Sequence, residues 1–168
     1  IALNVATGAL SDTAANLVLA FAGTVTQHTG TVAITDTHDL AQLKEINSES
    51  NGTITLNDYT VALNGSSADV AAALSGTFAS TYSGNVTLTD APSVAQLVTI
   101  NGNTTGEIAL NVATGALSDT AANLVLAFAG TVTQHTGTVT ITDAPTVAQL
   151  VTINAETTGA ITLGDTTG

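Results

Sequence analysis

Short stretches in which aliphatic and polar residues alternate recur along the chain and predict β-strands. Seven of them begin at Ile1, Val32, Ile54, Val86, Ile108, Val139 and Ile161. Alternation with a period of two is typical of a half-buried strand, in which one face meets a core and the other meets solvent. In "VTITD" at 139–143, for example, we expect Val139 and Ile141 to point inward and the two threonines to point outward.

The segments between these strands carry the pattern of short helices. After the strand at Val139 comes Asp143-Ala144-Pro145, and Asp is a frequent N-cap while Pro suits the first helical turn. Aliphatic residues then recur at every third position up to Ile153, and Asn154, like Asn47 and Asn101, is a residue type that can end a helix. The remaining connections start with Ser, continue with Ala and Leu, and stop at Gly, which predicts helices within 11–23, 66–76 and 118–130.

The chain repeats itself. Near-copies of one segment begin at Val32, Val86 and Val139, at spacings of 54 and 53 residues, and residues 1–32 recur unchanged at 108–139. Self-similarity at a fixed period is the signature of a repeat architecture. We therefore expect one continuous array over residues 1–168 without separate domains. Its units of about 53–54 residues, such as Val32 to Val86, would each comprise two strand–helix coils, of about 22 residues (Val32 to Ile54) and about 31–32 residues (Ile54 to Val86).

The order of strands and helices predicts the fold class. Consecutive strands that are joined by helices run parallel, with right-handed crossovers. Strands that are covered by helices on both faces read as continuous apolar runs, whereas these have a single aliphatic face. The sequence thus predicts an α/β fold, a single-file solenoid of parallel strands with helical connections on one face, in a layout like that of leucine-rich repeats. Seven strands stacked at about 4.8 Å would make a rod roughly 30 Å long.

Composition narrows the possible partners. The 168 residues are 44% hydrophobic but only 3% aromatic, so we expect a core of small aliphatic side chains. Thirteen acidic residues face a single basic one, Lys44, and the net charge is −12. Such a surface repels nucleic acid and anionic lipid, and no apolar run approaches the ~18 residues that a membrane span needs. An acidic surface of this kind suits a secreted protein in a salty medium, where salt screens the self-repulsion.

Acidic residues recur at the ends of the predicted strands, at Asp36, Asp58, Asp90, Asp143 and Asp165. Two interpretations compete. The carboxylates would act as helix N-caps, each accepting hydrogen bonds from backbone N–H groups of its own connection. Alternatively, neighbouring pairs would supply oxygen ligands to Ca²⁺, which takes six to eight of them. No EF-hand loop is present, so capping is the favoured interpretation and calcium the alternative; no other cofactor is expected.

Outward-facing threonines form a partial array at Thr35, Thr55, Thr87, Thr89, Thr140, Thr142 and Thr162. A regular Thr grid on a flat parallel sheet would suit ice binding. Here Ala, Asn and Gly interrupt the grid, and Thr is also an ordinary residue of exposed strands. Ice binding therefore stays a minor hypothesis.

Histidines do not predict a metal or catalytic site. His28 and His135 occupy equivalent places in "TVTQHTG", and Tyr82 stands at the same place in "TFASTYSG", so we interpret this position as a packing or hydrogen-bonding corner. His38 lies near Asp36 and Asp39, but a lone histidine is weak evidence for a metal. No Ser/His/Asp arrangement, phosphate loop or arginine is present. We therefore expect neither an enzyme nor a small-molecule substrate.

Two segments carry a resemblance to a known family. They are "VTLTDAPSVAQLVTINGNTTGEIAL" at 86–110 and "LSGTFASTYSGNVTLTD" at 74–90. They resemble repeats in the very large cell-surface proteins of marine cyanobacteria, a family that includes the giant surface protein associated with non-flagellar swimming. The resemblance extends over nearly the whole chain and implies an extracellular, acidic, structural protein. It marks a class of repeat rather than an activity, and carries over no catalytic or binding residues.

These observations together predict a structural repeat module of an extracellular filament, surface layer or giant cell-surface protein. We expect it to self-associate through the solenoid ends, near Ile1–Val5 and Ile161–Asp165, by backbone pairing and aliphatic stacking. The alternative from another class is a binding module, either a calcium-stabilised adhesin or, with less support, an ice-binding solenoid.

Overall fold

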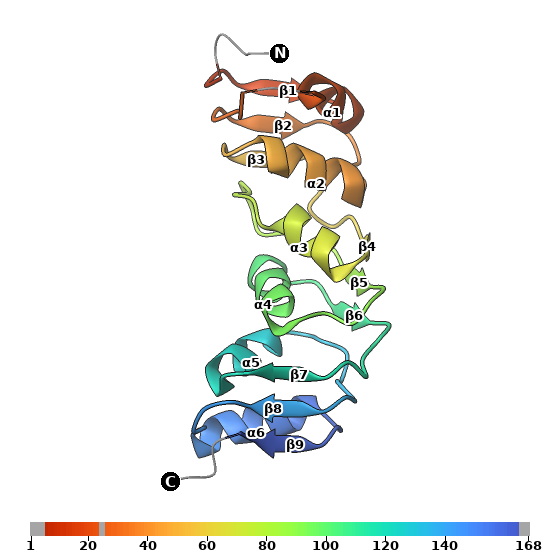
Figure 1. Ribbon diagram of the computed structural model, residues 1–168. Helices are drawn as coiled ribbons and strands as arrows, with labels where there is room; N and C mark the ends of the chain where they lie inside the picture. The colour runs from red at the N-terminus through yellow and green to blue at the C-terminus, as the bar shows by residue number, and fades with distance from the viewer. Residues whose placement is uncertain (1–5, 24–25, 165–168) are drawn as a thin grey trace.

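The computed structural model describes residues 6–23 and 26–164. Over these residues the chain forms an elongated α/β fold of nine short strands and six helices (Figure 1). The strands are β1 (Leu10–Asp12), β2 (Val32–Ile34), β3 (Ile54–Leu56), β4 (Leu63–Gly65), β5 (Val86–Leu88), β6 (Ile108–Leu110), β7 (Leu117–Asp119), β8 (Val139–Ile141) and β9 (Ile161–Leu163). The helices are α1 (Ala14–Phe21), α2 (Leu40–Glu49), α3 (Ser67–Leu74), α4 (Val94–Asn103), α5 (Ala121–Ala127) and α6 (Val147–Glu156).

The strands form three parallel sheets of three, in the orders β1-β2-β3, β4-β5-β6 and β7-β8-β9. Paired strands lie one coil apart in sequence, so that Val32 is opposite Ile54 and Val86 is opposite Ile108. The prediction of parallel strands joined by helices is confirmed. Six of the seven predicted strand starts coincide with strands of the structure, and the seventh, at Ile1, lies outside the described residues.

The prediction that seven strands form one continuous stack is wrong, because the described residues form nine strands in three sheets. Three further strands, β1, β4 and β7, lie in stretches that the sequence pattern assigned to connections. Leu63 of β4 follows Ile54 of β3 by nine residues, and Leu117 of β7 follows Ile108 of β6 by the same number. Each of the longer predicted coils therefore consists of a nine-residue step and a further coil, such as the one that runs from Leu63 to Val86. The step divides the strands into three sheets.

Backbone hydrogen bonds continue across these sheet breaks. The N–H of Ile54 donates to the Thr77 carbonyl at 2.8 Å, and the N–H of Ala79 donates to the Ile54 carbonyl at 2.9 Å. Ile108 makes the equivalent pair of bonds with the segment after α5. The last strand of each of the first two sheets is thus paired on both sides, once with a strand and once with an irregular segment.

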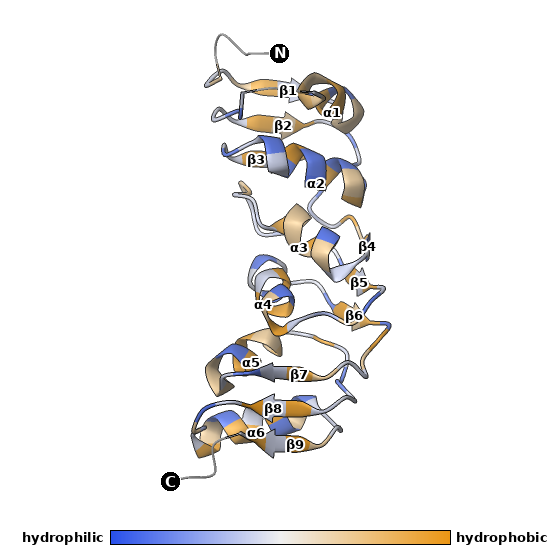
Figure 2. Ribbon diagram, in the orientation of Figure 1, coloured by the Kyte–Doolittle hydropathy of each residue, from blue (hydrophilic) through white to orange (hydrophobic). Residues whose placement is uncertain are grey.

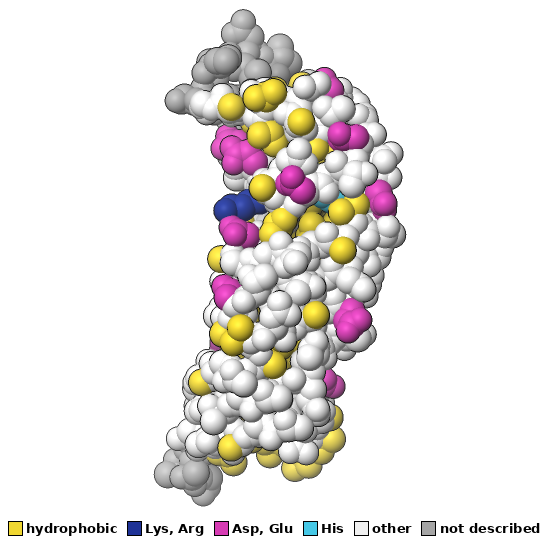
Figure 3. Space-filling view, turned by 90° about the vertical axis from the view of Figure 1, so that its right-hand side faces the viewer, with side chains coloured by type: hydrophobic (Ala, Val, Ile, Leu, Met, Phe, Trp, Pro, Cys, Tyr) yellow, Lys and Arg dark blue, Asp and Glu magenta, His cyan; other side chains and the backbone are white. Residues whose placement is uncertain are grey.

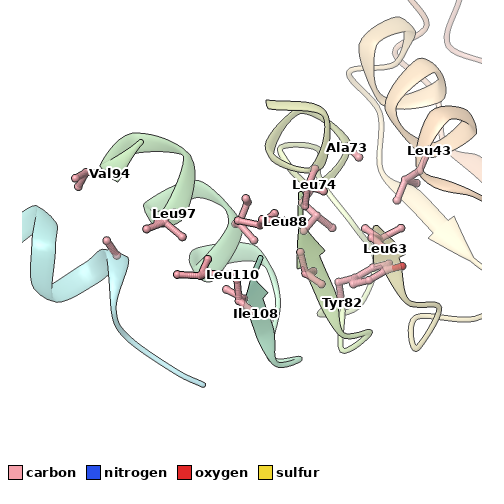
Figure 4. Close-up of a cluster of buried hydrophobic side chains, with 14 of the residues drawn as sticks. Leu43, Leu63, Ala73, Leu74, Tyr82, Leu88, Val94, Leu97, Ile108 and Leu110 are labelled. Carbon is pink, nitrogen blue, oxygen red and sulfur yellow. The ribbon is translucent and has the colours of Figure 1, made fainter. Parts of the chain in front are cut away.

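The core lies between each sheet and its helices. In β5 and β8 the aliphatic residues at both ends are buried and the threonine between them is half-buried, which confirms the predicted inward and outward faces. Leu43, Leu97 and Leu124 come from one face of α2, α4 and α5 and are fully buried. Figure 2 shows the hydrophobic strands and helix faces, and Figure 4 shows Leu97 in one cluster with Leu110 of β6. The aliphatic core that the composition predicts is thereby formed.

The helix boundaries differ from the predicted ones. Helix α6 begins at Val147 with Thr146 as its N-cap, in a capping box with Gln149, so Asp143 is not its cap. Asp39 and Ser93 cap α2 and α4 in the same way. A Ser, Thr or Asp three residues before Gln provides reciprocal bonds to the first helical turn, and this is a stronger start signal than the earlier Asp.

The sequence predicts helix ends at glycines and at asparagines, and the structure confirms Gly23 and Gly130 but none of the asparagines. Gly23 and Gly130 follow α1 and α5 with positive φ values of 94° and 76°, which confirms glycine as the stop signal there. The asparagines do not end their helices, because α2, α4 and α6 continue two residues beyond Asn47, Asn101 and Asn154. Their side chains have another role.

Candidate functional site

Three of the predicted carboxylates share one role. Asp36, Asp90 and Asp143 follow β2, β5 and β8, and each Oδ1 accepts a hydrogen bond from the first backbone N–H of a helix. The donors are Ala14 of α1, Ser67 of α3 and Ala121 of α5, at 2.7, 2.7 and 2.8 Å. A helix leaves such N–H groups unpaired, and its dipole favours a negative charge beside them.

The capped helix is not the one that was predicted. Each carboxylate was expected to bind N–H groups of its own connection, but the helix it contacts belongs to the preceding coil, 22–23 residues earlier in sequence. The reason is local. Helix α3 starts two residues after β4, so its first turn lies beside the end of the paired strand β5, whereas α4 starts six residues after β5. The contact therefore links two successive coils.

A fourth predicted carboxylate, Asp58, does not join this set. Asp58 lies in the short connection between β3 and β4, where its Oδ1 accepts bonds from the hydroxyl and the N–H of Thr60 at 2.6 and 2.8 Å. These bonds, the hydroxyl first, hold the pKa of Asp58 below its ordinary value. Asp165 lies outside the described residues. The four described carboxylates thus do not form one column.

Asparagines provide a second link between coils. The Nδ2 of Asn47 donates to the carbonyl of Ala72 at 2.7 Å and to Ser75 Oγ at 3.0 Å, at the end of α3. The Nδ2 of Asn101 reaches the end of α5 in the same way, at the carbonyls of Leu126 (3.1 Å), Ala127 (3.3 Å) and Ala129. The last carbonyls of a helix lack intrahelical partners.

Helices α3 and α5 are therefore held at both ends by their neighbours. An Asp from the following coil binds the N-terminus, and an Asn from the preceding coil binds the C-terminus. Local capping rules do not predict these bonds, because their partners are 22–28 residues apart. The sequence does contain an indication of this role, because asparagine stands at the equivalent position of all three copies, at Asn47, Asn101 and Asn154.

The histidine corner is a packing site, as predicted. His28, Tyr82 and His135 are buried at equivalent corners, where their backbones bridge to the next coil. Their rings pack against Phe21, Phe78 and Phe128, with centroids 6.1, 6.4 and 5.9 Å apart. Burial lowers the pKa of His135.

A cleft of about 560 Å³ lies between α2 and the coil of β4 and α3. His38 lines it and is buried, with Nε2 3.3 Å from the Tyr82 hydroxyl. That hydroxyl donates to the Val61 carbonyl at 2.6 Å, so the neutral His38 ring carries its proton on Nε2. Burial lowers the pKa of His38, against the opposing effect of Asp58, Asp39 and Asp36.

The cleft also holds the ion pair of Lys44 and Asp69, whose Nζ and Oδ1 lie 2.5 Å apart. Both side chains are substantially exposed, so water and salt screen the pair. Lys44 replaces a valine of the other two copies, and His38 replaces a proline. Two residues that line the cleft are thus peculiar to the most divergent copy, and the ion pair adds one more contact between neighbouring coils.

Within the described residues we find neither a cluster of metal-ligating side chains nor one continuous sheet that would carry a flat Thr face. In residues 6–23 and 26–164, no group of three or more His, Asp or Glu side chains is placed to hold a metal ion. Calcium binding stays the untested alternative to helix capping, because backbone carbonyls also ligate calcium. The exposed threonines are divided among three sheets whose directions differ, since the arrows of β1–β3 and β7–β9 point opposite ways in Figure 1.

A hollow of about 410 Å³ lies at the C-terminal end of the rod, over α6 and β9. Its lining combines apolar side chains with one amide, at Val147, Leu150, Val151, Asn154, Ile161 and Leu163. Hydrophobic side chains gather at the same end of the molecule in Figure 3. Three of the residues that line the hollow, Val147, Val151 and Leu163, are large hydrophobic residues that are exposed.

A scan against protein-family models gave no match, and neither did searches of the curated proteins and of the solved structures. Among the helices in the described part of the chain, none is long and apolar enough to cross a membrane.

Proposed function

We propose that the chain is a structural repeat module of an extracellular filament, surface layer or giant cell-surface protein. The observation that carries the proposal is the set of contacts between coils. Asp90 and Asn47 fix α3, and Asp143 and Asn101 fix α5, each from a neighbouring coil. Polar side chains at repeated positions thus join one coil to the next, which suits an array whose stability depends on contacts between neighbouring repeats.

We further propose a solenoid with a layout like that of leucine-rich repeats, modified by the nine-residue step. Each coil, taken from the start of one strand to the start of its paired strand, has one strand and one helix. Helices pack about 8–10 Å apart and strands about 4.8 Å apart, so an uninterrupted stack would bend. In this proposal, the nine-residue step after every second coil rotates the helices that follow about the long axis, so that the next pair of coils bends in a different direction. The opposite directions of β1–β3 and β7–β9 support this proposal (Figure 1).

The surface location rests on composition and on the resemblance. A net charge of −12 with one basic residue favours a salty exterior, where ions screen the repulsion. The resemblance to repeats of giant cyanobacterial surface proteins points the same way. The proposal includes no catalytic step.

Antibodies raised against this chain test the surface location on intact cells of the source organism. We expect labelling without permeabilisation. Labelling that needs permeabilised cells would overturn the proposal.

Chelation tests the calcium-stabilised adhesin. We expect the melting temperature in excess EDTA to equal that in excess Ca²⁺, because Asp36, Asp90 and Asp143 already bind helix N–H groups. A fall of several degrees on chelation would favour the adhesin instead.

A further inference from the structure

One stretch of sequence occurs twice in this chain, and in the described residues only one of the two copies packs on a preceding coil. Residues 108–139 are identical to residues 1–32, and the first of these segments follows the coil of β5 and α4. Ala127 and Leu117 are buried there, whereas their twins Ala20 and Leu10 are exposed and half-buried. The identical segment thus has a face that is complete only when another coil covers it.

At the C-terminal end of the rod, side chains whose equivalents inside the molecule are buried lie exposed. Val147 of α6 is 78% exposed, while the equivalent Val94 of α4 is 5% exposed. Leu163 of β9 is 39% exposed, while Leu110 of β6 is 7% exposed. The interior residues are buried because helix α5 and its coil pack on α4 and β6. Residues 139–154 differ from 86–101 only at Ile141 and Thr146.

We propose that this C-terminal face, formed by Val147, Leu150, Val151, Asn154, Ile161 and Leu163, binds residues 6–23 and 26–32 of a second copy of the chain. The inference rests on the proposed function and names the contact through which the modules would stack. The template is the packing of α5 on α4 inside the molecule. Its sequences are repeated at the two ends, so the same contact would form between two molecules, head to tail.

The template specifies a hydrogen-bond pattern. Inside the molecule Asn101 Nδ2 donates to the carbonyls at the end of α5. At the joint, Asn154 of one molecule would donate to the carbonyls of Leu19, Ala20 and Ala22 of the next. The N–H of Thr133 also donates to the Ile108 carbonyl at 2.9 Å, so Thr26 would donate to Ile161.

Few charges lie at the contact. Residues 6–23 and 26–32 carry one acidic side chain and no Lys or Arg, and that side chain, Asp12, accepts a hydrogen bond from the N–H of Thr13 on its own molecule. The contact is heterologous, since each molecule uses two different faces. It therefore propagates into a rod instead of closing as a symmetric dimer.

Sedimentation velocity over a wide concentration range tests the contact. We expect association that increases with concentration, and a dissociation constant about ten-fold larger or more in N154A and in V147D. Both positions lie at the open end, so each variant should fold, as circular dichroism would verify. The control A122D adds the same charge on the exposed face of α5 and should associate like the parent.

Directional cross-linking tests the register. The chain has no cysteine, so A22C and A155C each provide one unique thiol at an exposed position. With differently tagged chains and a flexible bis-maleimide, we expect A22C–A155C products over either homodimer. A155C homodimers would mean that two C-terminal faces pair symmetrically, which overturns the proposal.

A chain that stays monomeric at every concentration also overturns the contact. That result leaves the cell-labelling experiment unaffected. Failure of surface labelling, in turn, would reject the proposed function even if the chains stack.

Discussion

Removing the Asp90 carboxylate should weaken the contact between two coils without removing any core side chain. Its Oδ1 accepts the first N–H of α3, from Ser67, at 2.7 Å. In D90A that N–H loses its acceptor, and the N-terminus of the helix loses a nearby negative charge. Capping bonds are worth about 0.5–2 kcal/mol, and Asp90 is exposed, so we expect a loss of about 1 kcal/mol.

Thermal and urea unfolding, followed by circular dichroism, measure the loss. For a chain of this size, 1 kcal/mol corresponds to about 2–4 °C in melting temperature. D90N retains an oxygen acceptor without the charge and should lose about half as much. E107A removes one negative charge from another exposed position and is the matched control for net charge.

Hydrogen exchange locates the effect. The Ser67 amide should exchange about five-fold faster in D90A, which is the population change that 1 kcal/mol produces. Amides of α6, far along the rod, should change much less, because in repeat proteins each unit contacts mainly its neighbours. If D90A is no less stable than E107A, the carboxylate does not stabilise the joint between coils and the reasoning fails.

Three further changes probe other parts of the structure. N101A should lower the free energy of unfolding by about 1–2 kcal/mol in urea titrations, since carbonyls of α5 lose their donor, whereas N154A at low concentration should change little. G130A should cost about 1 kcal/mol, because φ is 76° there, while the helical substitution G102A should raise the melting temperature; equal effects would contradict the assigned backbone conformations. Burial lowers the pKa of His135, so the unfolded chain binds the proton first as pH falls below about 6.5, and stability is lost with decreasing pH by up to about 1.4 kcal/mol per unit. H135Y should flatten this slope between pH 7.5 and 5.5, and an unchanged slope would contradict the assignment.

The sequence pattern was sufficient where an element carries two aliphatic residues in alternation. The strands at Val86 and Val139 fall where the period of two placed them. The strand at Leu117 was missed because "LSD" contains one aliphatic residue, too few to show a period. The pairing of Leu117 with Val139 of the next coil provides the stability that the strand's own sequence does not indicate.

Local sequence rules do not predict the contacts between coils, because the contacting residues are far apart in sequence. Capping rules search within four residues of a helix end, and Asp143 was therefore assigned to the nearest helix. In the structure it binds Ala121 of α5 instead, because strand pairing brings positions one coil apart side by side. The histidine corner could be interpreted from sequence, since the interchange of His28 and Tyr82 at equivalent positions is typical of packing rather than of ligand binding.

Cryo-electron microscopy of the concentrated chain tests the central claim most directly, at a resolution that separates the helices. We expect rods longer than one molecule, in which α1 of each copy lies beside α6 of the preceding copy as α5 lies beside α4 within the chain. Particles no longer than one chain, or molecules joined side by side through their strand faces, would contradict the account.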